Sequence, residues 1–418
     1  MRQNNGNLQG DTWMSEPTLN AWAELSQIEA RGILEALKSG AVPTEHAELM
    51  AVGRDSWLSS VREDLEFIAA GGSKSRLIVA PYGGGKTHFL SLVRALALEQ
   101  KFAVSFVELR SREAPFDRFE TIFGKIMREV RTHDGQESVQ QILENWASSF
   151  PYYSAQEIER ALREISRSLD FRNALRTYLD LAAVSSPESL TSQQDIVAWL
   201  QGYPLPASVM KGLGIRNRLT ILNVSEVLTS FLQFLRATGY AGLVLLLDEA
   251  EAITSLSQSR RREEANQNLR RLLDNTDQNR GFYLLFATTP RFMEDPDRGA
   301  RSYPALWDRI RNVLTFQTRT PSKRALIMNL EPLDEDDCAS LAAKVVHIHA
   351  TAWDWPADEV LTDDVIRNYV GRYVEKKPDG TVRLFLRTLI DLLDVAQESV
   401  ESFEPYEVIG ELTFGDIM

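Results

Sequence analysis

The stretch Arg76-Leu-Ile-Val-Ala-Pro-Tyr-Gly-Gly-Gly-Lys-Thr-His-Phe-Leu90 decides the fold. A short apolar run from Leu77 to Ala80 predicts a strand, and the apolar-periodic residues from Phe89 to Leu96 predict a helix. Between them, the glycines predict a tight loop. This loop fits the template G-x-x-x-x-G-K-[S/T] as Ala80-x-x-x-x-Gly85-Lys86-Thr87, with alanine in place of the first glycine. The order strand, glycine loop, helix therefore predicts a phosphate-binding loop (P-loop).

The residue types in this glycine loop suit a nucleotide. Consecutive glycines let the backbone approach anionic oxygens and point its N–H groups at them, and the helix that follows adds the positive end of its dipole. Lys86 would bridge the β- and γ-phosphates, and the Thr87 hydroxyl would ligate Mg²⁺. The residues that we expect to contact the nucleotide here are Pro81, Tyr82, Gly83, Gly84, Gly85, Lys86, Thr87 and His88.

A second motif lies downstream, in Gly242-Leu-Val-Leu-Leu-Leu-Asp-Glu249. Five apolar residues in a row predict a strand buried on both faces, as in a parallel sheet, and the carboxylates fall where that strand ends. This is the pattern of a Walker B motif. Asp248 would hold Mg²⁺ through water, and Glu249 would orient or deprotonate the attacking water. The alternative, an acidic helix cap after a core strand, is disfavoured by the glycine loop upstream.

Three further segments are expected to be strands: Phe102–Leu109, Phe282–Ala287 and Val313–Gln317. The second of these ends in Thr288, whose hydroxyl would bond the γ-phosphate or the water, or would simply lie in a turn. Because the Asp248 and Thr288 strands are consecutive in the sequence, other strands must separate or flank them. Open α/β sheets bind ligands at the carboxyl ends of their strands. We expect one crevice there to hold Lys86, Thr87, Asp248, Glu249 and Thr288.

Composition limits the class of protein. The chain has 418 residues, enough for two or three domains, and a net charge of −13, which argues against a non-specific nucleic-acid coat protein. Its only cysteine, Cys338, excludes an intrachain disulfide framework and a cysteine-based metal site. There is no apolar run long enough for a membrane span and no export signal, so we expect a cytoplasmic protein.

The domain organisation follows from composition and periodicity. Residues 1–20 are polar and predict a disordered tail, and residues 21–325 predict the sheet-containing core. Within the core, a helical pattern without a convincing strand predicts an insertion at about 116–215. Residues 326–418 predict an all-helical lid, in which Asp334 to Asp337 caps the first helix and Gly380 to Arg383 opens the last long one.

Taken together, these features resemble the AAA+ and related STAND ATPases. More closely, they resemble the ATP-binding proteins of bacteriophage-exclusion (BREX) phage-defence islands, the BrxD-like proteins. The resemblance covers roughly residues 25–395. It rests on Ala51-Val-Gly-Arg-Asp55, Val79 to Leu90, Val107-Glu-Leu-Arg110, Trp199-Leu-Gln-Gly202, Gly239 to Glu251 and Val382 to Arg387. The fold class that it implies is an AAA+-like α/β core with a parallel sheet, a helical insertion and a helical lid.

The resemblance also implies roles for several residues. Arg383 matches the lid arginine (sensor 2) that touches the γ-phosphate when the lid closes. Arg309 or Arg311 would be a finger reaching the nucleotide of a neighbouring subunit in a homo-oligomer, or else a surface arginine paired with acid. Gly53 and Arg54 match a pair that lies beside the adenine, or else form a turn glycine and a solvated arginine.

The expected reaction is hydrolysis of ATP to ADP and phosphate with Mg²⁺ as cofactor. One hypothesis is a phage-defence motor or loader that acts on DNA or on a DNA-modifying partner. In it, the basic cluster Arg260, Arg261 and Arg262 would line a central channel, although such a cluster is also typical of a solvated helix face. The alternative is a nucleotide-gated switch or scaffold that recruits an effector among the other defence-system proteins. A small-molecule kinase is disfavoured by the Asp-Glu pair and the helical lid.

Overall fold

The computed structural model describes residues 22, 25–109, 116–132, 138–150, 154–184, 186–311, 324–378 and 380–414. The predicted tail at 1–20 and the predicted strand at 313–317 lie outside these residues. The chain forms two compact units. One consists of Met1–Asp55, Tyr82–Leu92 and Glu331–Met418, and the other of Ser56–Pro81 and Val93–Leu330. The glycine loop therefore belongs to the same unit as the C-terminal helices, and the strand before it belongs to the sheet-containing unit.

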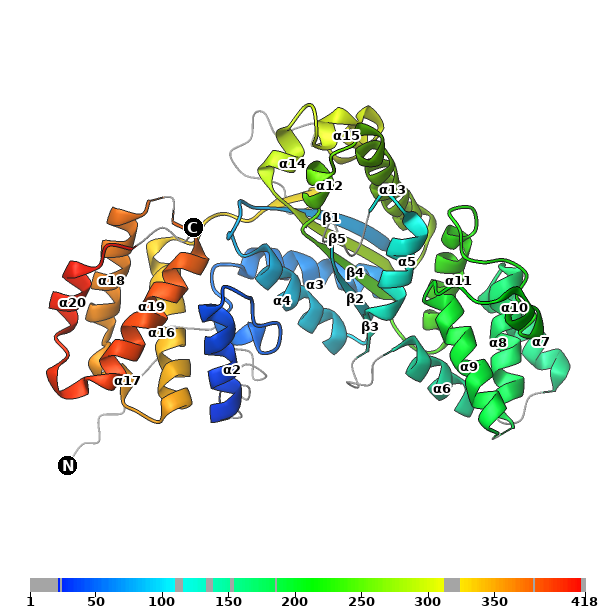
Figure 1. Ribbon diagram of the computed structural model, residues 1–418, viewed down its shortest axis with the longest axis horizontal. Helices are drawn as coiled ribbons and strands as arrows, with labels where there is room; N and C mark the ends of the chain where they lie inside the picture. Colours follow the sequence, from blue (N-terminus) through cyan, green and yellow to red (C-terminus); the bar gives the residue numbers. More distant parts are fainter. Residues whose placement is uncertain are drawn as a thin grey trace. The chain divides into compact units, whose positions relative to one another are not determined.

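The sheet has six strands in the order β3-β2-β4-β5-β1-β6 (Figure 1). Their bounds are Ser73–Val79 (β1), Ala103–Glu108 (β2), Val130–Arg131 (β3), Leu243–Asp248 (β4), Phe282–Thr288 (β5) and Ile327–Asn329 (β6). All neighbouring pairs are parallel except β2 and β3. The predicted α/β class with a largely parallel sheet is confirmed. β4 and β5 are direct neighbours, flanked by β2 and β1.

Burial explains why the central strands form where the sequence predicts them. Every residue of β4 and of β5 is buried, as expected for parallel strands with both faces covered. The crossover from β4 to β5 contains α12 (Ala252–Ser255) and α13 (Ser259–Gln278), and α13 packs on β1 and β5. On the other side of β4, α5 (Phe119–Arg128) packs on β2. α5 ends at Arg128, and Val130 of β3 pairs with Ser105 of β2.

The segment between β3 and β4 is helical in the residues described. Its helices are α6 (Val139–Ser148), α7 (Ala155–Ile165), α8 (Leu169–Ala182), α9 (Pro187–Leu200), α10 (Ala207–Gly212) and α11 (Val224–Ala237). The predicted insertion at about 116–215 also includes β3, which the sequence did not predict. Serine side chains cap the first four at Ser138, Ser154, Ser168 and Ser186, each accepting from a backbone N–H of the first turn. α8 packs against α6, α7 and α9 (Figure 1).

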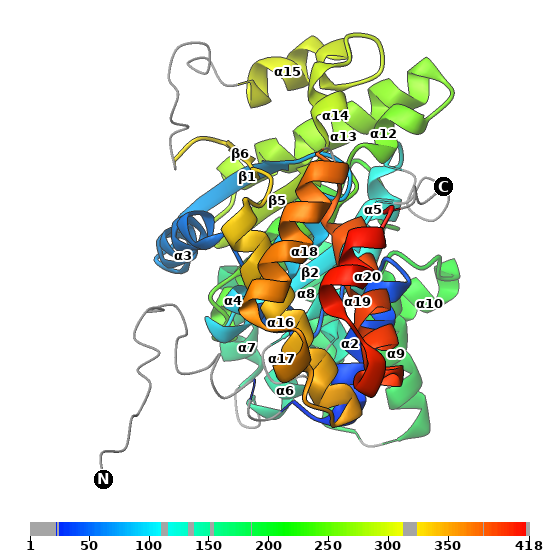
Figure 2. The same cartoon turned by 90° about the vertical axis from the view of Figure 1, so that its left-hand side faces the viewer.

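The other unit is built from helices. They are α2 (Gln27–Lys38), the short η1 (Ala47–Met50), α16 (Glu335–Trp353), α17 (Ala357–Val360), α18 (Asp363–Lys376), α19 (Val382–Glu398) and α20 (Pro405–Glu411). α16 packs against α2, α18 and α19, and Figure 2 shows α16, α18, α19 and α20 side by side. The predicted cap is confirmed, since the Asp334 side chain accepts from the Asp337 N–H at 2.8 Å.

A buried histidine joins two of these helices. His349 has no exposed surface, and Trp355 Nε1–H donates to its Nδ1 at 2.9 Å. Its Nε2 therefore carries the ring proton and donates to Asp394 in α19 at 3.1 Å. Burial lowers the pKa of His349 below its ordinary value, although the hydrogen bond to Asp394 opposes this shift. The ring is therefore neutral and fixed in one tautomer.

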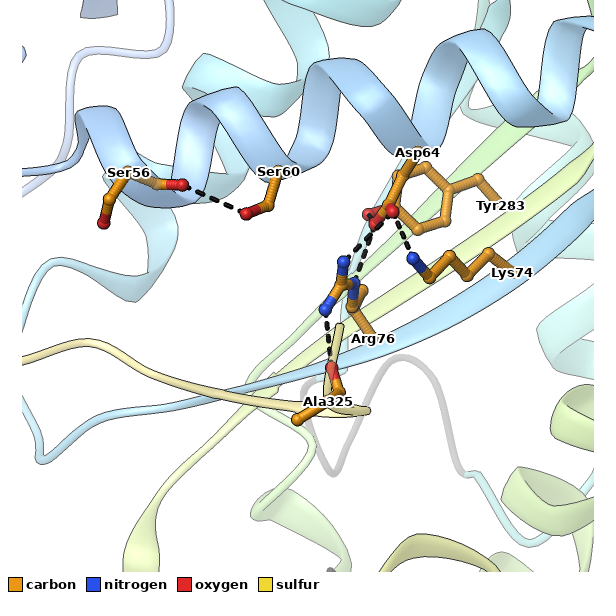
Figure 3. Close-up of polar contacts among 7 residues, drawn as sticks. All are labelled: Ser56, Ser60, Asp64, Lys74, Arg76, Tyr283 and Ala325. Carbon is orange, nitrogen blue, oxygen red and sulfur yellow. Dashed lines mark hydrogen bonds and ion pairs between the residues drawn. The ribbon is translucent and has the colours of Figure 1, made fainter. Parts of the chain in front are cut away.

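The sheet-containing unit holds a buried ionic network at the start of β1 (Figure 3). Asp64, in α3 (Asp55–Ala69), accepts from Arg76 Nε at 2.7 Å and from the Tyr283 hydroxyl at 2.7 Å, and it pairs with Lys74. Arg76 and Asp64 are 1% and 3% exposed, and Arg76 also donates to the Ala325 carbonyl. The network therefore joins α3, β1, β5 and the segment before β6.

Of the helices described, none is long and apolar enough to cross a membrane.

Candidate functional site

The carboxyl ends of β4 and β5 carry three of the predicted residues. Asp248 is the last residue of β4, is 2% exposed, and accepts the Glu249 backbone N–H at 2.9 Å. Glu249 is exposed and has a φ of +58°, a left-handed conformation that is unfavourable for a residue with a Cβ. The next residue, Ala250, donates its N–H to the Ala287 carbonyl of β5 at 3.0 Å. This bond holds the strained turn in place, as is typical of functional sites.

Thr288 ends β5 beside the start of the glycine loop. It pairs with Val79 of β1, and its carbonyl accepts the Ala80 N–H at 3.2 Å. The side chain has no exposed surface, and its hydroxyl has no hydrogen-bond partner among the residues described. An unsatisfied buried hydroxyl costs free energy. The predicted bond to a phosphate or to the attacking water would offset this cost.

The glycine loop has the backbone conformation that its sequence predicts. Gly83 and Gly85 have φ values of +74° and +84°, which glycine adopts without strain. The helix after it, α4 (Lys86–Glu99), starts at Lys86, which is 7% exposed. In its first turn, His88 Nε2 lies 2.9 Å from the Ala47 carbonyl. Burial lowers the pKa of His88, so the neutral ring donates this bond and fastens α4 to η1.

Arg54 lies under the glycine loop and is not solvated. Its side chain is 7% exposed, and Nη1 donates to the Glu331 carbonyl at 2.9 Å. A Cβ on Gly85 would lie 4.0 Å from Arg54 Nη2. Burial lowers the pKa of Arg54, and the nearby carboxylates of Asp337 and Glu331 oppose that shift. The alternative of a solvated arginine is therefore wrong, and the contact with adenine stays a prediction.

Gly53 and Asp337 show a contact that the sequence did not reveal. Gly53 has a φ of +61°, and a Cβ there would lie 2.3 Å from Asp337 Oδ2. Burial raises the pKa of Asp337, helped by the charge of Asp334. Asp337 stands in the predicted cap of α16, but no local signal connects it with residue 53.

Arg383, the predicted lid arginine, contacts the glycine loop. It is the second residue of α19, its Cζ lies 5.3 Å from the ring centroid of Tyr82, and its Nη1 donates to the Tyr82 hydroxyl at 3.1 Å. Thr381, which caps α19, lies against Gly83, where an added Cβ would be 2.8 Å from the threonine Cβ. The structure thus joins the start of α19 to the loop. Thr381 was missed as a loop contact because its sequence signal is only that of a helix cap.

The two candidate finger arginines, Arg309 and Arg311, have acidic partners within the chain. Arg309, in α15 (Pro304–Ile310), pairs with Asp277 and lies 3.8 Å from Asp274, and Arg311 pairs with Asp308 at 3.1 Å. A role as a finger would require these pairs to open.

The predicted basic cluster in α13 is also engaged. Arg260 pairs with Glu264 at 3.0 Å, Arg261 pairs with Asp117 at 2.7 Å, and Arg262 Nη1 donates to the Leu256 carbonyl at 2.8 Å. Binding of DNA by this cluster stays a prediction.

The residue types fit Mg²⁺ and a nucleotide. Mg²⁺ prefers oxygen ligands and is commonly held by one or two carboxylates together with substrate phosphates. The Thr87 hydroxyl and the Asp248 carboxylate are groups of this kind, and Lys86 would supply a charge for phosphates.

One comparison with known proteins finds a family. The family model described as BREX system ATP-binding protein BrxC/D matches residues 25–412. No curated protein matches the sequence.

Proposed function

The chain belongs to the BrxC/D family of BREX system ATP-binding proteins, and we propose that it is an AAA+-like P-loop ATPase that hydrolyses ATP with Mg²⁺. The observation that carries the proposal is the turn after β4. There, Glu249 is held at a φ of +58° directly after the buried Asp248, and the neighbouring β5 ends in Thr288, whose hydroxyl has no partner in the described part of the chain. An acidic residue that only capped a helix would not explain this strain.

The proposed mechanism gives each residue one role. The N–H groups of Gly83 to Gly85 and the Lys86 ammonium bind the phosphates, and Arg383 adds charge at the γ-phosphate. Glu249 orients a water molecule and accepts its proton as the water oxygen bonds to the γ-phosphorus and the bond to the β–γ bridging oxygen breaks. The Thr288 hydroxyl donates to the γ-phosphate or holds the water. Mg²⁺, when held by Thr87 and Asp248, neutralises phosphate charge.

Two variants test the proposal. Lys86→Ala is expected to abolish ATP binding, because the loop loses its only side-chain cation. Glu249→Gln is expected to bind ATP normally and to hydrolyse it at least about 100-fold more slowly, because the amide cannot accept the proton. Binding is measured by calorimetry and hydrolysis by phosphate release. Wild-type protein that binds no ATP, or a Glu249→Gln variant that hydrolyses at the wild-type rate, would contradict the proposal.

The second candidate function is a nucleotide-gated switch that recruits another defence-system protein. The observation that favours it over direct action on DNA is that the α13 arginines are paired with acids or carbonyls of their own chain. A switch of this kind requires only that ATP shift a conformational equilibrium.

DNA and the Glu249→Gln variant distinguish the two functions. A motor or loader should hydrolyse ATP faster with duplex DNA and should form a homo-oligomer with ATP. A switch should be insensitive to DNA, and its Glu249→Gln variant should remain bound to the partner in the presence of ATP. Arg260→Ala should reduce the stimulation of ATP hydrolysis by duplex DNA only if the protein is a motor or loader.

A further inference from the structure

Tyr82 and Arg383 form a contact that the proposed chemistry does not use. Tyr82 is 67% exposed. The guanidinium of Arg383 lies over its face, 5.3 Å from the centroid, and also donates to its hydroxyl at 3.1 Å. The ring therefore contacts Arg383 in two ways, through its face and through its oxygen.

Over the ranges described, Arg383 lacks the acidic partner that several other arginines of this acidic chain have. Among the residues described, no carboxylate pairs with Arg383, whereas Arg261 and Arg309 each have an acidic partner. A cation in the first turn of a helix is also disfavoured by the helix dipole. A guanidinium has five N–H donors, and the Tyr82 hydroxyl takes only one. Arg383 is therefore held in place with most of its donors left for an anion.

Neighbouring contacts fix the direction of the Arg383 side chain. A Cβ on Gly40 would lie 3.1 Å from Arg383 Cδ, so the end of α2 limits the aliphatic part. At the start of α19, the Tyr373 hydroxyl donates to the Thr381 carbonyl at 2.9 Å, and Thr381 lies against Gly83. The start of α19 and the glycine loop thus pack directly against each other, and the contact with Tyr82 fixes the position of the Arg383 guanidinium.

We propose that Tyr82 is a positioning residue that holds the Arg383 guanidinium beside the glycine loop for the terminal phosphate of a nucleoside triphosphate. The inference rests on the proposed function and deepens it. The Tyr82 ring and hydroxyl hold the guanidinium through one N–H and leave its other donors for phosphate oxygens, which arginine binds through paired N–H groups. Because a diphosphate lacks the γ-phosphate, the pair distinguishes ATP from ADP.

A double-mutant cycle tests this role. Affinities for AMP-PNP and for ADP, each with Mg²⁺, are measured by calorimetry for the wild type, Tyr82→Ala, Arg383→Ala and the double variant. We expect Tyr82→Ala to weaken AMP-PNP binding about fivefold more than it weakens ADP binding. The double variant should bind AMP-PNP no more weakly than Arg383→Ala alone, because Tyr82 acts through Arg383. Tyr82→Phe should retain most of the wild-type affinity, since the ring face remains.

A matched control exists in the insertion. Tyr203 is 49% exposed and carries Arg128 at 5.2 Å from its ring centroid. Tyr203→Ala removes the same kind of contact and should change neither affinity. Independent, multiplicative losses for Tyr82→Ala and Arg383→Ala, or equal losses for ADP and AMP-PNP, would overturn the inference while the ATPase proposal stands. A wild-type protein that binds neither nucleotide would overturn both.

Discussion

Replacing Thr288 with valine should make the protein more stable and less active. Thr288 has no exposed surface, and its hydroxyl has no partner among the residues described. A buried hydroxyl without a hydrogen bond costs about 1–3 kcal/mol, and valine has nearly the same shape without that cost. Taking the lower end, because the turn after β5 lies near solvent-exposed residues, we expect Thr288→Val to raise the free energy of unfolding by about 1 kcal/mol.

The same substitution at Thr276 is a matched control. Thr276 is 1% exposed, but its hydroxyl donates to the Leu272 carbonyl at 3.0 Å in α13. Thr276→Val removes a satisfied hydrogen bond and should lower the free energy of unfolding by about 0.5–1.5 kcal/mol. Both variants replace a buried threonine with valine. Because one hydroxyl is hydrogen-bonded and the other is not, the two substitutions should change the free energy of unfolding in opposite directions.

The assays are urea denaturation without nucleotide and phosphate release at saturating ATP. If the Thr288 hydroxyl contacts the γ-phosphate or the attacking water, Thr288→Val should hydrolyse ATP at least about tenfold more slowly, and Thr276→Val should not. A Thr288→Val protein that is destabilised like Thr276→Val would show that the hydroxyl is already satisfied. An unchanged rate would show that it does not take part in hydrolysis.

Three other perturbations follow from the geometry. Burial lowers the pKa of His349, so below a pH of about 6.5 the imidazole takes up a proton in the unfolded chain but not in the folded one. The free energy of unfolding should therefore fall as the pH drops from about 6.5 to about 5. Denaturation across that pH range measures the effect. Asp64→Asn should lower the free energy of unfolding by about 3–5 kcal/mol, because it leaves the buried Arg76 without its counter-charge. Glu164→Gln, which breaks an exposed ion pair with Arg160, should lower it by less than about 1 kcal/mol in the same denaturation assay. Gly83→Ala should weaken ATP binding in calorimetry, because an alanine at a φ of +74° is strained and its Cβ would meet Thr381; an unaltered affinity would show that the loop backbone can move at this point.

The sequence predicted the parts of the fold whose signal is local. β4 and β5 are apolar runs, and their burial requires little beyond the hydrophobic pattern. The bounds of α11, Val224 and Ala237, follow from apolar positions that recur at the helical period and end before Gly239. The cap of α16 at Asp334 was predictable from residue type, because aspartate is a preferred N-cap residue.

The short strands were not predictable. β3 and β6 have two and three residues, fewer than any periodic pattern needs. They form because β2 and β1 have backbone groups to pair at those edges. The Leu77 N–H, for example, donates to the Leu326 carbonyl at 2.8 Å, next to β6.

The contacts around the glycine loop were also beyond the sequence, since they join distant residues. Arg54 and Glu331 are 277 positions apart, and Tyr82 and Arg383 are 301 positions apart. Residue type explains each contact once the fold has brought the pair together. A buried guanidinium needs a carbonyl, and an exposed guanidinium without an acid benefits from an aromatic face. Neither requirement names its partner in advance.

Two of the positions that break local rules, Glu249 and Thr288, lie at the carboxyl ends of neighbouring strands. Glutamate is a poor residue for a φ of +58°, and a threonine hydroxyl is normally hydrogen-bonded when buried. Sequences that specify a fold consistently tend to violate such rules at functional sites. A ligand that bonded the Thr288 hydroxyl would remove one of these costs, and ligands that bind the folded state stabilise it by mass action. ATP should therefore stabilise wild-type protein more than Thr288→Val, and an equal gain in thermal stability for the two would mean that the hydroxyl and the nucleotide do not meet.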